Sequence, residues 1–319
     1  MKQTAIAAVL SLAAYPAAGE LVLDLPIDCT PGESCYVQHF VDRDPSADVQ
    51  DFTCGTLSYD GHKGTDFALP TLQDMDRGVD VLAAAPGIVA GLRDGMADRI
   101  YQPGDVEVDN RECGNGTVIR HEDGWETQYC HLKSGSLRVA QGQRVESGTV
   151  LGQVGLSGQT QFPHLHLSVR HNGTVVDPYQ PDMSVACDTP TSDLWADTPE
   201  YTPGGVIYAG FFPGLPEYDA IKQGSAAQTT LEPDAPGLVL FAFAYGGQKG
   251  DVLTLEIEGP DGAFLNKAIT LEKPQAQFFR AAGKRRTQGP WAEGTYSGTA
   301  ILTRKGAEVS RQSTRMTIN

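Results

Sequence analysis

The sequence predicts a mostly β protein in which an antiparallel β-sheet region precedes a smaller β-sandwich. Short apolar runs of strand length are punctuated by glycine, and none keeps the i, i+3, i+4, i+7 spacing of an amphipathic helix over three turns. Residues 187–204 are crowded with Pro, Thr, Asp and Gly, which is typical of a linker. We therefore expect two folded domains in the 319 residues, at 55–186 and 205–319.

Residues 1–19 are expected to be a cleaved signal peptide, with Lys2 as its positive region, an apolar run from Ala5 to Ala14, and small residues near Gly19. A membrane-spanning helix needs about 20 apolar residues, and neither this run nor any later stretch reaches that length. The sequence thus predicts an exported chain, periplasmic or extracellular, with no membrane span after cleavage.

The chain has six cysteines, an even number that predicts three disulfides in an exported protein. No C-x-x-C pair is present, which disfavours a cysteine zinc site. Many pairings are open. Local proximity favours two of the pairs and elimination leaves the third: Cys29–Cys35, Cys113–Cys130 and Cys54–Cys187. The first pair lies in residues 20–54, which we expect to form an N-terminal arm.

Charge is unevenly distributed along a chain whose net charge is −16. Residues 267–319 hold 10 Lys and Arg against 3 Asp and Glu, whereas the preceding residues hold 14 against 37. Because phosphate binding needs clustered cations, the acidic part excludes a nucleic-acid partner. The basic end could contact an anionic polymer such as cell-wall material or be a solvated face.

The expected strands follow one another in two groups. Those before the linker are 79–84, 87–92, 117–120, 125–132, 150–154 and 165–169, and those after it are 205–212, 238–244, 252–258, 264–271, 277–281, 294–303 and 309–318. The second group is similar in pattern to immunoglobulin-like modules, although the Cys…Trp…Cys signature is absent. It contains no histidine, and its role as a binding or spacing module stays open.

Two histidine motifs suggest a metal site. In His164-Leu165-His166 both imidazoles lie on one face of a strand, while Leu165 points into a core. His62 and Asp66 stand four residues apart, and the neighbouring glycines favour a strand or tight loop over a helix. Two imidazoles and a carboxylate would leave a fourth zinc position for water, which is typical of a catalytic site.

His131 ends an expected strand, on the face shared by Thr127 and Tyr129. A lone histidine in this position is usually a hydrogen-bonded strand residue.

Four ordered motifs resemble those of the lysostaphin-type (LytM-like) zinc metalloendopeptidases over roughly residues 55–180. They are H-x-x-x-D at 62–66, Y-x-H-L at 129–132, V-x-x-G-x-x-V-x-x-G-x-x-[IL]-G-x-x-G at 139–155, and G-x-[ST]-x-x-x-H-x-H at 158–166. The resemblance implies a LytM-like antiparallel peptidase fold. It implies that His62, Asp66 and His166 bind one Zn²⁺, and that His131 and His164 are the non-ligand catalytic histidines, one of them the general base. Which one is the base stays open.

The resemblance also implies the substrate, a peptide bond in peptidoglycan, either in a stem-peptide cross-link or in a glycine-containing bridge. Tyr59 is a loose candidate for the tyrosine that stabilises the oxyanion in this family. The alternative is a non-catalytic LytM-like regulator of cell-wall hydrolases. Oligomeric state is not predicted.

Two segments depart from the simplest family pattern. The acidic insertion 96–113 and the loop 159–163 are expected to change the shape of the groove. The arm contains His39, which could supply a fourth ligand in a latent form, or the arm could be purely structural.

Overall fold

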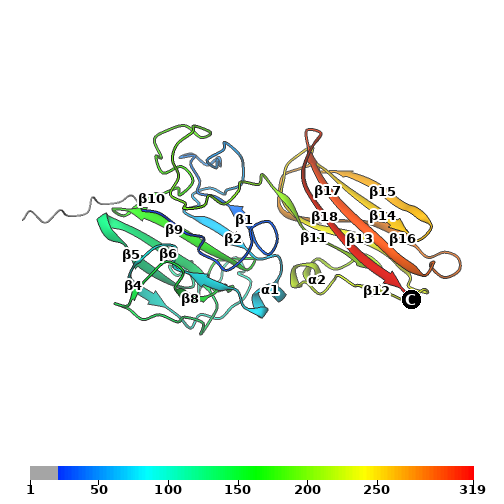
Figure 1. Ribbon diagram of the computed structural model, residues 1–319, viewed down its shortest axis with the longest axis horizontal. Helices are drawn as coiled ribbons and strands as arrows, with labels where there is room; N and C mark the ends of the chain where they lie inside the picture. Colours follow the sequence, from blue (N-terminus) through cyan, green and yellow to red (C-terminus); the bar gives the residue numbers. More distant parts are fainter. Residues whose placement is uncertain (1–20) are drawn as a thin grey trace, which may run out of the picture.

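The computed structural model describes residues 21–319, which form two β-rich parts lying side by side (Figure 1). The expected signal peptide lies outside the described residues. The prediction of a mostly β, antiparallel protein is confirmed. Within residues 21–319, no helix has the length and apolar character needed to cross a bilayer.

The first part is built on an eight-stranded antiparallel sheet in the order β1-β2-β9-β6-β5-β4-β7, with β10 paired to β9. A two-stranded sheet, β3-β8, packs beside it. The strands are β1 Tyr36–His39, β2 Thr65–Ala68, β3 Asp80–Leu82, β4 Gly87–Arg93, β5 Asn115–Arg120, β6 Trp125–Leu132, β7 Arg144–Val145, β8 Val150–Gln153, β9 His164–His171 and β10 Thr174–Val176. The helices are α1 Leu72–Arg77 and the 3-10 turn Glu122–Gly124.

Strand β9 shows why the sheet has two different faces. Leu165, Leu167 and Val169 are fully buried in the main core, as their period of two predicts. His164 and His166 point to the other face of the sheet. Burial of the leucines thus fixes the direction of both imidazoles, because a slip of one residue would exchange the two faces.

The N-terminal arm belongs to the same core as the sheet. Leu23, Ile27, Tyr36 and Phe40 are buried in the hydrophobic cluster that contains the β9 leucines. The three disulfides pair as predicted, Cys29–Cys35, Cys54–Cys187 and Cys113–Cys130. The Cys54–Cys187 disulfide joins the arm to the segment that follows the eight-stranded sheet.

The C-terminal part consists of two sheets, β11-β13-β16 and β12-β18-β17-β14-β15. In β14, Leu253, Leu255 and Ile257 are buried while the residues between them are not, which is the alternation of a half-buried strand. The elements are β11 Gly205–Phe212, α2 Tyr218–Gln223, β12 Thr230–Leu231, β13 Gly237–Gly247, β14 Val252–Gly259, β15 Gly262–Thr270, β16 Gln275–Arg285, β17 Gly294–Arg304 and β18 Ala307–Ile318. The likeness to immunoglobulin modules stays a prediction.

The two parts meet along β1 and β16. Gln277 on β16 donates hydrogen bonds to Tyr36 Oη (3.0 Å) and Gln38 Oε1 (3.3 Å). The Tyr36 ring packs on Tyr245 with centroids 4.4 Å apart. Strand β1 is therefore the edge strand of the eight-stranded sheet and also contacts β16 of the C-terminal part.

Several elements were not expected from the sequence. Strands β1, β2, β7, β10 and β12 are two to four residues long, and each of the helices α1 and α2 has six residues. A helix of fewer than two turns cannot display a 3.6-residue period, so the pattern carried no signal for it.

Candidate metal centre

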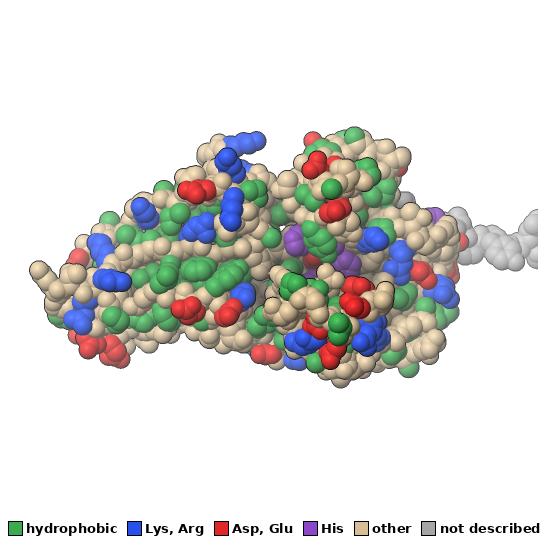
Figure 2. All heavy atoms as spheres, turned by 180° about the vertical axis from the view of Figure 1, so that it is seen from behind, with side chains coloured by type: hydrophobic (Ala, Val, Ile, Leu, Met, Phe, Trp, Pro, Cys, Tyr) green, Lys and Arg blue, Asp and Glu red, His purple; other side chains and the backbone are tan. Residues whose placement is uncertain are grey.

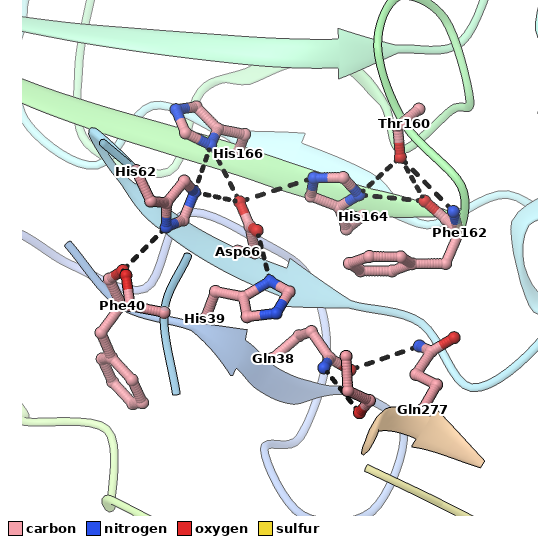
Figure 3. Close-up of polar contacts among 12 residues, drawn as sticks. Gln38, His39, Phe40, His62, Asp66, Thr160, Phe162, His164, His166 and Gln277 are labelled. Atoms are coloured by element: carbon pink, nitrogen blue, oxygen red, sulfur yellow. Dashed lines mark hydrogen bonds and ion pairs between the residues drawn. The ribbon is translucent and has the colours of Figure 1, made fainter. Parts of the chain in front are cut away.

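The site lies on the open face of the large sheet, where four neighbouring strands bring polar residues into one row. The register pairs His39 with Asp66, Asp66 with His166, and His166 with Cys130. Side chains of directly paired residues share a face of the sheet. The row therefore places His39, Asp66 and His166 side by side, as Figure 3 shows.

Three donor atoms converge at this row. Asp66 Oδ1 lies 2.8 Å from His166 Nδ1 and 3.2 Å from His62 Nε2, and the two nitrogens are 3.1 Å apart. Among residues 21–319, His62, Asp66 and His166 are the group whose ligand atoms all lie within 4.8 Å of one another. These are the three residues that the resemblance implies as ligands.

The backbone orients His62 for metal binding. His62 Nδ1 donates a 2.7 Å hydrogen bond to the carbonyl of Phe40 in the arm. This bond selects the tautomer in which Nε2 carries a lone pair, and Nε2 faces Asp66. The Tyr59 ring lies against the imidazole, with centroids 4.3 Å apart.

The donor set fits zinc. In a tetrahedral site with ligands at about 2.0–2.1 Å, the donor atoms lie about 3.3 Å from one another. The separations of 2.8–3.2 Å among the three atoms are close to this value. Two imidazole nitrogens and one carboxylate oxygen are also the ligand types of catalytic zinc sites with an open position.

The charge on Asp66 is stabilised by its neighbours. Burial opposes its ionisation, but His62 and His164, together with hydrogen bonds from His166 and His39, outweigh that effect and hold the pKa of the carboxyl well below its usual range. The carboxylate therefore remains an anionic ligand at neutral pH.

His164 lies beside the three candidate ligands, on the same face of β9. Its Nδ1 donates to the carbonyl of Phe162 (2.9 Å), and the Phe162 ring stacks on it at 4.4 Å. Its Nε2 faces Asp66 Oδ1 at 3.5 Å. Burial lowers the pKa of His164 to about 4, so this imidazole is neutral at neutral pH.

The expected orientation of His131 is wrong. The period of two places it on the face of Thr127 and Tyr129, but those residues are fully buried, whereas His131 lines the site together with Cys130. The reason is its backbone: His131 has a φ of 63°, in the left-handed region that few non-glycine residues adopt. This conformation interrupts the alternation, and such strain is frequent at functional sites.

His131 is held by a second backbone contact. Its Nδ1 donates to the carbonyl of Ser157 (2.8 Å), which leaves the lone pair on Nε2. The ring lies 4.6 Å from that of His164 and 6.0 Å from that of His166. Burial, followed by the nearby His164 and His166, holds the pKa of His131 well below its usual range.

The site opens into a cleft of about 960 Å³. Figure 2 shows the histidines at the bottom of a hollow in the molecular surface. Tyr101 and Glu112 of the acidic insertion line one part of the cleft, and Phe162 of the loop 159–163 lines another. Both segments that depart from the family pattern therefore shape the groove. Tyr59, half exposed, also lines it.

Sequence reasoning treated His39 only as a possible latency ligand in the arm. In the structure it hydrogen-bonds to Asp66, but it is outside the group of three donor residues. The placement of His39 beside Asp66 depends on strand β1, and its four residues, 36–39, are too few to be recognised as a strand from the sequence.

Gly64 is needed for the packing of the site. A Cβ at this position would lie 2.5 Å from the carbonyl oxygen of Leu167 and 2.6 Å from His166 Nε2. Because the first of these atoms belongs to the backbone of β9, the conflict cannot be relieved by rotating a side chain. We expect Gly64→Ala to lower the free energy of unfolding by about 1–3 kcal/mol, as measured by urea denaturation in the presence of chelator. We also expect it to weaken metal binding, as measured by zinc titration.

Gly91 provides the matched control, because nothing lies within 4 Å of a Cβ at that position and its φ is not positive. Gly91→Ala should change stability by less than about 0.5 kcal/mol. Wild-type stability and zinc affinity in Gly64→Ala would contradict the role given to this glycine.

The part of the chain that holds this site is similar in sequence to known peptidases. Residues 60–178 match Peptidase family M23. The DD-carboxypeptidase/endopeptidase Mpg of Neisseria meningitidis serogroup B is 37% identical over 131 residues, which are 40% of this chain and 24% of that protein. The peptidoglycan DD-endopeptidase ShyA of Vibrio cholerae is 28% identical over 133 residues, 42% of this chain and 26% of that protein. The chain spans about a quarter of the length of these relatives.

Among solved structures, the catalytic domain of a variant of the prophage-encoded M23 protein EnpA from Enterococcus faecalis matches with a TM-score of 0.33 and 23% identity. The match covers 48% of this chain and 95% of that one.

Proposed function

We propose that this chain is a zinc-dependent endopeptidase that hydrolyses peptide bonds in peptidoglycan, and the match of residues 60–178 to Peptidase family M23 supports the proposal. The observation that carries the proposal is the convergence of His62 Nε2, Asp66 Oδ1 and His166 Nδ1 at the bottom of an open cleft. Two further imidazoles, those of His131 and His164, lie beside these atoms.

His62, Asp66 and His166 would hold one zinc ion through these atoms. When bound, Zn²⁺ supplies Lewis-acid activation of the scissile carbonyl and of water. The hydrogen bond from His62 to Phe40 supports this assignment, because metal-binding histidines usually donate their other ring N–H to a fixed acceptor.

The proton transfers fall to His131 and His164. Each has its Nδ1 proton bound to a backbone carbonyl, so each presents an unprotonated Nε2. One would accept the proton of the attacking water and return it to the leaving amine, while the other would donate to the developing oxyanion once protonated. Tyr59, on the rim of the same cleft, is a further candidate donor to the oxyanion.

The proposed substrate is the stem-peptide cross-link rather than a glycine-containing bridge. The relatives named above are a DD-carboxypeptidase/endopeptidase and a peptidoglycan DD-endopeptidase, which favours a bond between D-amino acids. We also propose that the chain works outside the cytoplasm, because three disulfides persist only in an oxidising compartment.

The test is incubation of the zinc-loaded chain with purified cross-linked peptidoglycan, followed by mass spectrometry of the released fragments. We expect cross-linked dimers to be converted into monomers, the activity to disappear with chelator, and zinc to restore it. The non-catalytic alternative predicts a different result, a chain without zinc or hydrolysis that stimulates another cell-wall hydrolase. Unchanged fragments in the presence of a zinc-loaded chain would also overturn the proposed activity.

A further inference from the structure

The two oxygens of Asp66 have different partners. Oδ1 faces the donor atoms of His62 and His166, at 3.2 and 2.8 Å. Oδ2 accepts a 3.1 Å hydrogen bond from His39 Nδ1, on the neighbouring strand β1 (Figure 3). One end of the carboxylate is therefore directed at the candidate zinc position and the other at the arm.

His39 itself is held in place by packing. Its side chain is 12% exposed. Its ring meets Tyr59 edge-on at 5.3 Å and lies 5.8 Å from the ring of His62. Because His39 is not among the residues whose ligand atoms lie within 4.8 Å of one another, its position suits a partner of the carboxylate rather than a fourth ligand.

The strand that carries His39 is fixed from its other side by the C-terminal part. The side chain of Gln38 points toward Gln277 rather than toward Asp66 (Figure 3). Gln38 donates to the carbonyl of Ala276 (3.2 Å) and accepts from Gln277 (3.3 Å), and it is fully buried. A chain of contacts thus leads from β16 through β1 to the carboxylate.

We propose that His39 is a positioning residue, which holds the Asp66 carboxylate through Oδ2 so that Oδ1 stays directed at the zinc, and that the C-terminal part supports it through Gln277. The inference rests on the proposed function. Partners that orient a metal-binding group typically contribute a factor of about 10–100 to metal affinity. On this view the arm and the C-terminal sheet belong to the metal site, although neither supplies a ligand.

The test compares zinc affinity, by competition with a chelator, in the full chain and four variants. His39→Ala should bind zinc about 10–100-fold more weakly. His39→Asn should retain most of the affinity, because its amide N–H can replace the Nδ1 donor. Gln277→Ala should weaken binding less than His39→Ala does. His121→Ala is the matched control: this histidine bonds to Pro86 and Thr127, away from the site, and its loss should leave the affinity unchanged.

The visible spectrum of the Co²⁺-loaded chain separates positioning from ligation. It should keep its band positions in His39→Ala, since the ligands remain the same, whereas a changed spectrum would make His39 a ligand and overturn the proposal. Wild-type affinity in His39→Ala, or equal losses in His39→Ala and His39→Asn, would also overturn it. Unchanged affinity in Gln277→Ala would overturn the supporting role of the C-terminal part. A wild-type chain that binds no zinc would overturn the proposed function itself.

Discussion

Replacement of His166 by alanine is expected to abolish zinc binding and peptidase activity together. The substitution removes the nitrogen that lies 2.8 Å from Asp66 Oδ1 and 3.1 Å from His62 Nε2. Only two protein donors would remain where catalytic zinc sites have three. The loss should therefore exceed the factor of about 10–100 that follows the loss of an orienting partner.

The measurement is the zinc content of the purified variant, together with its hydrolysis of cross-linked peptidoglycan. His171→Ala is a suitable control on the same strand, since His171 stacks on Trp125 at 4.3 Å and does not line the cleft. Its zinc content and activity should match those of the wild type. Stoichiometric zinc and full activity in His166→Ala would refute the assignment.

Replacement of His131 should separate chemistry from metal binding. We expect His131→Ala to keep its zinc and to lose turnover by a factor of about 10²–10⁴, the usual contribution of a positioned acid or base. His131→Asn is the sharper variant. Asparagine tolerates the positive φ of this position better than alanine does, and its amide can replace the Nδ1 donor to Ser157. It cannot replace the basic Nε2.

His131→Asn should therefore fold and bind zinc like the wild type but show a reduced kcat. Thermal unfolding and zinc titration check the first two properties, and the rate of cross-link hydrolysis checks the third. A wild-type kcat would exclude His131 from the proton transfers, and loss of zinc would identify it as a ligand.

Several features of the fold could be predicted because they depend on short stretches of sequence. The alternation in β9 predicted that Leu165 and Leu167 enter the core and that the two flanking histidines face the opposite way. The cysteine spacing predicted two of the disulfides, and elimination predicted the third. The ordered motifs predicted a resemblance to the family whose model matches residues 60–178. Apart from Cys54–Cys187, which was left by elimination and joins residues 133 apart, each prediction rests on residues that are close in the sequence or on motifs that occur in order.

The wrong expectation for His131 shows where local reasoning fails. A period of two holds only while every residue keeps the extended conformation. No sequence pattern predicted that His131 would adopt a left-handed conformation. The surrounding structure stabilises that conformation, through the hydrogen bonds of His131 N to Cys113 O and of Nδ1 to Ser157 O. Both acceptors lie far from His131 in the sequence.

By itself, the sequence determined which donors are available: the histidines and the aspartate of the ordered motifs, and the strand face that carries His164 and His166. Only the tertiary structure decided how they combine. The placement of His39 against Asp66 depends on the register between β1 and β2, and the support of β1 depends on its contact with β16. Register is set by the burial of whole strand faces and by backbone pairing between distant segments, so it has no signature in the residues next to His39.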